Sequence, residues 1–137
     1  MFIDNRTNPD NNVIKGFRKM SKQRIFDRAV KHIGETRVKS FKTRCLYSGT
    51  GCNAAPLLVE GFREEADHYG AWSELVTIGM VPATNEAFIC DLQTAHDRSQ
   101  NDSSFMRYWL RNMYKLAEQY KLNATALDKV AISVGSC

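Results

Sequence analysis

The sequence lacks the features that mark membrane and exported proteins. No apolar run approaches the roughly 20 residues that a membrane-spanning helix needs, so we expect no membrane segment. Residues 1–19, MFIDNRTNPDNNVIKGFRK, are polar and have no apolar core of the kind found in secretory signals. We therefore expect a cytoplasmic protein whose four cysteines are reduced thiols rather than a disulfide framework.

The sequence also lacks the motifs of common phosphate and metal sites. Residues 48–52, SGTGC, have no Gly-x4-Gly-Lys-Ser/Thr frame, which argues against a phosphate-binding loop of that type. Cys45 and Cys52 are separated by six residues rather than by the short gap of a zinc knuckle, with Cys90 and His96 as distant partners. Free cysteine is among the most buried residue types, so packing alone explains these thiols. We predict no metal site and no cofactor.

What the sequence does contain is typical of one globular domain. Its 137 residues are 43% hydrophobic and 25% charged, and a chain of this length buries a substantial core. Residues 1–20 are rich in Asn and Asp and predict a polar N-terminal arm. The end of this arm contains the apolar residues Val13, Ile14 and Phe17, which would attach it to the core. Residues 21–137 are then expected to form a single helical domain.

Apolar residues recur at helical spacing through most of the chain, which predicts a mainly α, compact helical bundle. Ser21 is a good N-cap for a helix over 22–33, and Gly34 is a good stop for it. Residues 38–54 predict at most a small β-hairpin, with Gly49 and Gly51 supplying the positive φ angles of its turn. Further helices are expected over 56–66 from Pro56, over 73–78 before Gly79, from Thr84 or Asn85 to about 97, and from Ser103 or Ser104 to about 121, with 122–137 as a short helix or tail.

The net charge of +4 conceals an uneven distribution along the chain. Residues 1–50 contain 12 Lys and Arg against 4 Asp and Glu, whereas residues 51–100 contain 2 against 8. A basic segment of this kind binds an acidic protein surface or a nucleic acid. The alternative is that the basic helix simply faces the acidic middle segment of the same molecule.

The predicted partner-binding surface lies on the arm and on the outer face of the first helix. Its cations are not interleaved with aromatic residues and belong to no known reading module, so nucleic acid would be bound by charge and not by sequence. The expected partner is an acidic protein surface, with nucleic acid as the variant. The residues of this surface are Lys15, Arg18, Lys19, Lys22, Arg24, Arg28 and Lys31.

Two catalytic arrangements are alternatives to binding. Cys52 at the start of a helix would be a nucleophile, because a helix N-terminus lowers a thiol pKa, with His96 and Asp97 as base and orienting group. The pair His96 and Asp97 is also similar to the His-Asp pair of metal phosphohydrolases, with His68 and Asp128 in the outer roles. Such inventories are common in chains of this length, and His96 lies on the apolar stripe of its helix. We therefore predict no catalytic residue.

The order of several segments resembles a family of small phage-borne proteins of unassigned function. The segments are SKQRIFDRAVKHI, CLYSGTGCNAAPLL, ICDLQTAHD and WLRNMYKLAEQYKL, within residues 21–122. The chain departs from the family in the polar arm before Ser21 and in NAAP, residues 53–56, where the family tends to have a glycine. The resemblance implies a phage origin and a host-cell compartment, and no catalytic chemistry. It rests on Cys45, Tyr47, Gly49, Gly51, Cys52, Leu92, Gln93, His96, Asp97 and Trp109.

These observations together predict a small, non-enzymatic phage accessory protein that binds and modulates a host defence or transcription complex in the bacterial cytoplasm. The alternatives are a small hydrolase that uses Cys52 or the pair His96 and Asp97, and a non-specific nucleic-acid binder.

Overall fold

The computed structural model describes residues 8–36, 46–49, 51–99 and 104–135. Within these ranges the chain is mainly helical and contains no strand, which confirms the predicted mainly α class. The α-helices are α1 (Lys22–Thr36), α2 (Arg63–Ala66), α3 (Trp72–Thr77), α4 (Glu86–Asp97), α5 (Phe105–Tyr120) and α6 (Thr125–Gly135). The 3-10 helices are η2 (Pro9–Asn11), η3 (Phe17–Lys19), η4 (Ala55–Leu57) and η5 (Glu60–Phe62).

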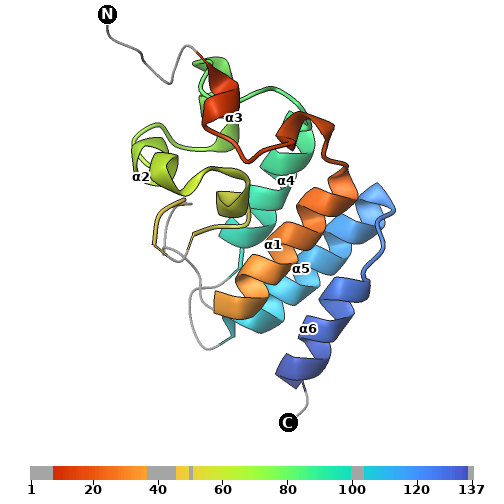
Figure 1. The fold of residues 1–137 in the computed structure, drawn as a ribbon. Helices are drawn as coiled ribbons and strands as arrows, with labels where there is room; N and C mark the ends of the chain where they lie inside the picture. The colour runs from red at the N-terminus through yellow and green to blue at the C-terminus, as the bar shows by residue number, and fades with distance from the viewer. Residues whose placement is uncertain (1–7, 37–45, 50, 100–103, 136–137) are drawn as a thin grey trace, which may run out of the picture.

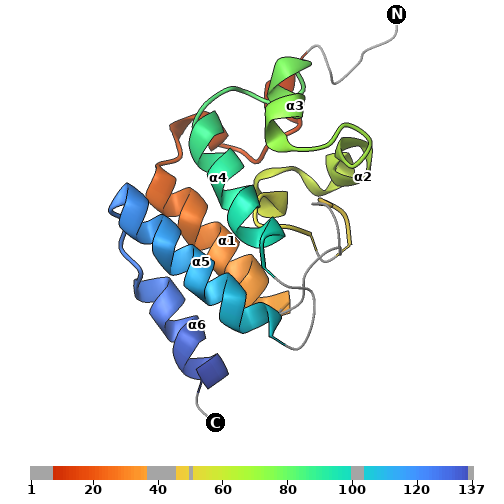
Figure 2. The same cartoon turned by 180° about the vertical axis from the view of Figure 1, so that it is seen from behind.

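The helices form two groups that share one cluster of buried side chains. Helix α6 contacts both α1 and α5, and these three helices lie alongside one another (Figures 1 and 2). Helix α4 contacts α5 and also α3, so it joins the long helices to the short ones. As a result, α2 and α6 lie at opposite sides of the molecule (Figure 1). In the part of the chain that the structure describes, no helix is both long enough and apolar enough to cross a bilayer.

The buried faces of the long helices follow the spacing in the sequence. An amphipathic helix is stabilised mainly by burial of its apolar stripe, because isolated helices of this length are marginal in water. Helix α1 buries Ile25, Phe26, Ala29, Val30 and Ile33, and α5 buries Phe105, Trp109, Met113, Leu116 and Ala117.

The described end of the predicted arm is part of the core. Val13, Phe17 and Met20 are each buried, and the Phe17 and Trp72 ring centroids are 5.8 Å apart. Val13 also forms an isolated antiparallel bridge with Leu58. Residues 8–20 therefore pack on the core and also form backbone contacts with the segment around Leu58.

Helix α1 continues through Gly34, so the expected stop at that residue was wrong. Gly34 lies against α6, where an added Cβ would come within 2.9 Å of a Val130 methyl carbon. The glycine is thus required for the close approach of two helices, and it lies inside the helix rather than in a left-handed terminal position. Residue size, and not backbone conformation, explains it.

The helix expected over 56–66 was also wrong. Instead the segment forms η4, an extended residue Leu58, then η5 and the single turn α2. The reason is the bridge to the arm: the Ile14 N–H donates to the Leu57 carbonyl at 3.0 Å, and the Val59 N–H donates to the Asn12 carbonyl at 3.0 Å. These long-range hydrogen bonds use backbone groups that a continuous helix would have kept for itself.

The turn before η4 depends on two glycines in the left-handed region, as expected, with φ of 65° at Gly49 and 74° at Gly51. Most of the hairpin predicted near 38–54 lies outside the described residues. An added Cβ at Gly49 would meet nothing within 4 Å. At Gly51 it would lie 2.6 Å from the Ala55 Cβ and 2.9 Å from the His32 Nε2. Only Gly51 is therefore needed for space as well as for φ.

We predict that Gly51→Ala destabilises the fold far more than Gly49→Ala. Both variants place a side chain in the left-handed region, at a cost of about 1–2 kcal/mol, and Gly51→Ala adds an overpacking cost of about 1–3 kcal/mol. Urea unfolding of the two variants against the wild type measures the difference. Equal losses would mean that Gly51 is not closely packed.

Two tyrosine–carboxylate hydrogen bonds connect α5 to its neighbours. Tyr120 donates to Asp91 of α4, and Tyr114 donates to the Asp128 carboxylate of α6 at 2.5 Å. The pKa of Tyr120 is raised to about 12, mainly by its hydrogen bond to Asp91 and also by burial. The pKa of Tyr114 is also raised to about 12, mainly by burial and also by its hydrogen bond to Asp128. The folded protein therefore holds these phenol protons more tightly than the unfolded chain does.

We predict a loss of stability in alkali that depends on Tyr120. Because its folded pKa is raised from about 10 to about 12, its contribution is complete below pH 10 and is lost as the pH rises through 12. The free energy of unfolding, measured by urea titration at pH 8 to 12, should fall less steeply in Tyr120→Phe than in the wild type. Tyr69→Phe is the control, since its hydroxyl bonds to no carboxylate among the described residues. A slope unchanged in Tyr120→Phe would contradict the prediction.

Candidate functional site

The structure places the candidate nucleophile Cys52 in the interior. Its side chain is 0% exposed, and its sulfur is part of a disulfide. The expectation that all four cysteines are reduced was therefore wrong for Cys52. Cys90, the other cysteine within the described residues, is free and half-buried, and burial, with the Glu86 charge, raises the pKa of its thiol. Neither sulfur has the exposed, low-pKa setting of a catalytic cysteine.

Cys52 lies beside a hydrogen-bond network centred on Gln93. The Gln93 Oε1 accepts from the Trp72 N–H at 2.8 Å, and its Nε2 donates to the Tyr47 hydroxyl at 2.8 Å. The Tyr47 hydroxyl in turn donates to the Gly70 carbonyl at 2.9 Å, and the Cys52 Sγ lies 4.0 Å from the Gln93 Nε2. Residues of the Cys-x-Tyr turn and of the Leu-Gln-x-x-His-Asp helix thus meet in the core.

A carboxylate that the sequence did not single out holds the turn. Asp67, directly after α2, accepts from the Tyr47 N–H at 2.6 Å and from the Ser48 hydroxyl. Burial raises the pKa of Tyr47 well above its ordinary range, and the Asp97 and Asp67 charges act in the same direction. Tyr47 therefore stays neutral and serves as a hydrogen-bonding core residue, not as a base.

Asn53 is a second residue that the sequence did not single out. Its Nδ2 donates to the Leu92 carbonyl at 2.8 Å, and its Oδ1 accepts from the Trp109 Nε1 at 3.0 Å. The amide thereby connects the turn to α4 and α5 at once. The only signal in the sequence was an Asn within an otherwise apolar run, because a buried amide must find partners.

His96 and Asp97 are adjacent but differ in surroundings. His96 is 0% exposed, with its Nδ1 3.2 Å from the Asp97 Oδ1 and its ring 5.8 Å from that of Phe105. Its Nε2 is buried and has no hydrogen-bond partner, so it is not directed at a substrate in solvent. This arrangement favours a structural role for His96 in the core over a catalytic one.

The outer residues of the metal arrangement do not join the pair. His68 follows α2, whereas Asp128 is on α6 and accepts from Tyr114, and these helices lie at opposite sides of the molecule (Figure 1). Among the described residues, no group of three His, Cys, Asp or Glu side chains could hold a metal ion. The tertiary fold therefore does not assemble the phosphohydrolase arrangement.

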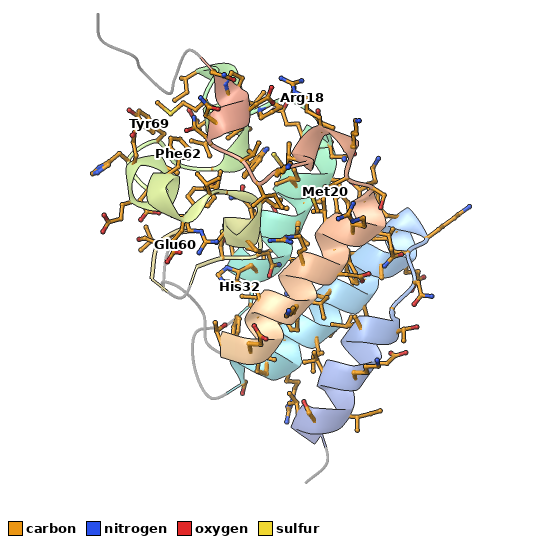
Figure 3. The ribbon with its side chains drawn as sticks, in the orientation of Figure 1. Arg18, Met20, His32, Glu60, Phe62 and Tyr69 are labelled. Carbon is orange, nitrogen blue, oxygen red and sulfur yellow. The ribbon has the colours of Figure 1, made fainter. Side chains whose placement is uncertain are left out.

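The seven residues of the predicted basic surface are all exposed. We call Arg24, Arg28 and Lys31 the α1 basic face. The Arg28 Nη2 donates to the Pro56 carbonyl at 3.2 Å, and a shallow depression of about 210 Å³ lies between Arg28, Lys31, His32, Glu35 and Pro56. His32 projects from α1 (Figure 3). The guanidinium of Arg28 is thus oriented by the backbone and still open to solvent.

The α1 basic face is not neutralised by the acidic middle segment. The one ion pair within the seven-residue surface, as far as the structure describes the chain, joins Arg18 to Asp10 at 2.7 Å. Exposed carboxylates of the middle segment include Glu64 and Glu65 on α2 and Glu60 just before it, and Glu60 lies apart from α1 (Figure 3). The exposed carboxylates of residues 60–65 therefore lie on a different segment from the α1 basic face, which is bordered on its own helix by Glu35.

A second basic surface was not predicted from the sequence. Arg107, Arg111 and Lys115 are exposed and lie four residues apart on α5, and we call them the α5 stripe. The Arg111 guanidinium carbon lies 5.2 Å from the centroid of the Tyr108 ring. The spacing of three cations at i, i+4 and i+8 was the signal that could have revealed it.

In comparisons with known proteins, no protein-family model, no curated protein and no solved structure matches the chain.

We predict that Gln93→Leu is strongly destabilising. The variant keeps similar volume but leaves the buried Trp72 N–H without its acceptor, at a cost of about 1–3 kcal/mol, and removes one of the two hydrogen bonds of the Tyr47 hydroxyl, which still donates to the Gly70 carbonyl. The neighbouring Thr94→Ala, at an exposed position of the same helix, should stay within about 0.5 kcal/mol. Chemical unfolding of both variants measures this, and a near-neutral Gln93→Leu would contradict the structural role of the network.

Proposed function

We propose that this protein is a non-enzymatic binding protein that docks on an acidic partner through the α1 basic face and the neighbouring cations of residues 15–22. Following its resemblance to small phage-borne proteins, it acts in the bacterial cytoplasm and modulates a host defence or transcription complex. Because Cys52 is fully buried, reducing thiols of the cytoplasm have little access to its disulfide, so the disulfide is compatible with this compartment.

The observation that carries this proposal is the contrast between the two sets of candidate residues. Of the catalytic candidates, Cys52 and His96 are fully buried within the core, and Asp97 is exposed with its carboxylate 3.2 Å from the buried His96 Nδ1. In contrast, Arg24, Arg28 and Lys31 are exposed, and none of them is ion-paired within the described residues. Catalysis needs a nucleophile, a base and a charge stabiliser around a position that a substrate can reach. Docking needs only an exposed charged surface.

The separation of charge also favours docking on a charged partner. Complementary potentials raise the rate of encounter and fix its orientation more than they add to affinity. An acidic partner would approach the α1 side and be repelled by the carboxylates around α2. Such binding should weaken as salt rises, because the Debye length is about 10 Å at 0.1 M.

We predict that Arg24→Glu, Arg28→Glu and Lys31→Glu together abolish capture of the partner. The tagged wild type and this variant are compared in affinity capture from bacterial lysate, and the recovered protein is purified and titrated directly. The control is Arg107→Glu, Arg111→Glu and Lys115→Glu, which carries the same net charge on another helix. We expect at least a tenfold loss of affinity in the α1 variant and less than a twofold change in the control.

Circular dichroism confirms that each variant is folded before it is used. Recovery of no specific partner by the wild type would refute the proposal, as would equal binding by the α1 variant. Hydrolysis of a nucleotide or phosphodiester that is lost in His96→Ala and Asp97→Ala without unfolding would replace the proposal with the hydrolase alternative.

A further inference from the structure

We propose that the α5 stripe and the groove beside it form a second binding surface, which takes the backbone of a single-stranded nucleic acid. This inference is independent of the α1 basic face, because it concerns other residues and another class of partner. Figure 2 shows α5 from the side of the molecule on which it lies in front of α1.

The first observation is the geometry of the stripe. Helix α5 is continuous from Phe105 to Tyr120, and a step of four residues advances about 6 Å along a helix. Arg107, Arg111 and Lys115 therefore form a row of exposed cations, opposite the buried stripe that contains Trp109 and Met113. A regular row of this kind follows a chain of phosphates better than it follows the irregular carboxylates of a folded protein.

The second observation is a groove between α4 and α5 of about 220 Å³. Lys115 lines it from α5, and Arg98 lines it from the end of α4, so a positive charge stands on each side. The carboxylate of Asp91 also lines the groove, where it accepts the Tyr120 hydroxyl. The row of cations thus continues from the stripe into a depression that is open to solvent.

The local charge balance remains positive. The cations are Arg98, Arg107, Arg111 and Lys115, and the carboxylates that line the groove or lie within three residues of a cation on these two helices are Asp91, Asp97 and Glu118. The excess of positive charge suits a polyanion, which binds by releasing its condensed counterions.

The third observation distinguishes nucleic acid from an acidic protein. The guanidinium carbon of Arg111 lies over the half-buried Tyr108 ring, 5.2 Å from its centroid, which gives a cation–π pair beside the other cations of the stripe. Unpaired bases stack on guanidinium planes and on aromatic rings, whereas carboxylate side chains gain nothing from a ring. A duplex hides the faces of its bases, so the pair favours a single strand.

The test measures binding of a fluorescent oligothymidylate to the full chain by anisotropy at several salt concentrations. The main variant is Arg107→Gln, Arg111→Gln and Lys115→Gln, and its matched control is Arg24→Gln, Arg28→Gln and Lys31→Gln. We expect the α5 variant to bind at least tenfold more weakly, while the control changes less than twofold. Because each phosphate contact on a single strand contributes about 0.7 to the salt slope, loss of three contacts should reduce that slope by about 2.

A second variant, Tyr108→Leu, separates stacking from charge alone. It should weaken binding to oligothymidylate severalfold and leave binding to heparin, which has no bases, unchanged. Thermal unfolding of each variant shows that it remains folded.

Four results would overturn the proposal. They are no binding by the wild type at low salt, equal losses in the α1 and α5 variants, tighter binding of a duplex than of the single strand, and an unchanged affinity in Tyr108→Leu. An acidic protein partner that is lost with the α5 variant would assign this surface to a protein instead.

Discussion

Gln93 is 3% exposed, and its carboxamide forms hydrogen bonds with two segments that lie far from it in the sequence. Its oxygen accepts from the Trp72 N–H at the start of α3, and its nitrogen donates to the Tyr47 hydroxyl of the turn. A buried amide without these partners would be costly, so the turn, α3 and α4 can pack together only in the one arrangement that satisfies it. Asn53 performs the same task between the turn, α4 and α5.

This requirement explains why residues that suggest catalysis are structural here. The Cys-x-Tyr turn and the Leu-Gln-x-x-His-Asp helix contain groups that an enzyme could use, but Tyr47, Cys52 and His96 are buried in the core. Tyr47 is neutral because burial raises its pKa, and Cys52 is in a disulfide. His96 is enclosed against Phe105. These three side chains therefore serve the interior of the fold.

The surface charges fall into separate areas because different helices turn their polar faces outward. Helix α1 presents Arg24, Arg28 and Lys31, the region before and around α2 presents carboxylates, and α5 presents its own row of cations. Each helix buries its apolar stripe, so its charged residues point away from the core. We propose that the two basic surfaces on different helices take different partners, and the charge-matched variants of α1 and α5 separate their roles.

The sequence by itself determined the class of fold, the long helices α1, α4 and α5, and the exposure of the basic residues, because helical periodicity and capping are local properties. It also indicated positive φ at Gly49 and Gly51, which the structure has. Only the tertiary structure decided the rest. The segment over 56–66 forms short turns because Leu58 pairs with Val13, and Gly34 lies within a helix because α6 packs against it. The roles of Gln93, Asn53 and Asp67 depend on which distant groups meet in space, and no local pattern in a single chain contains that information.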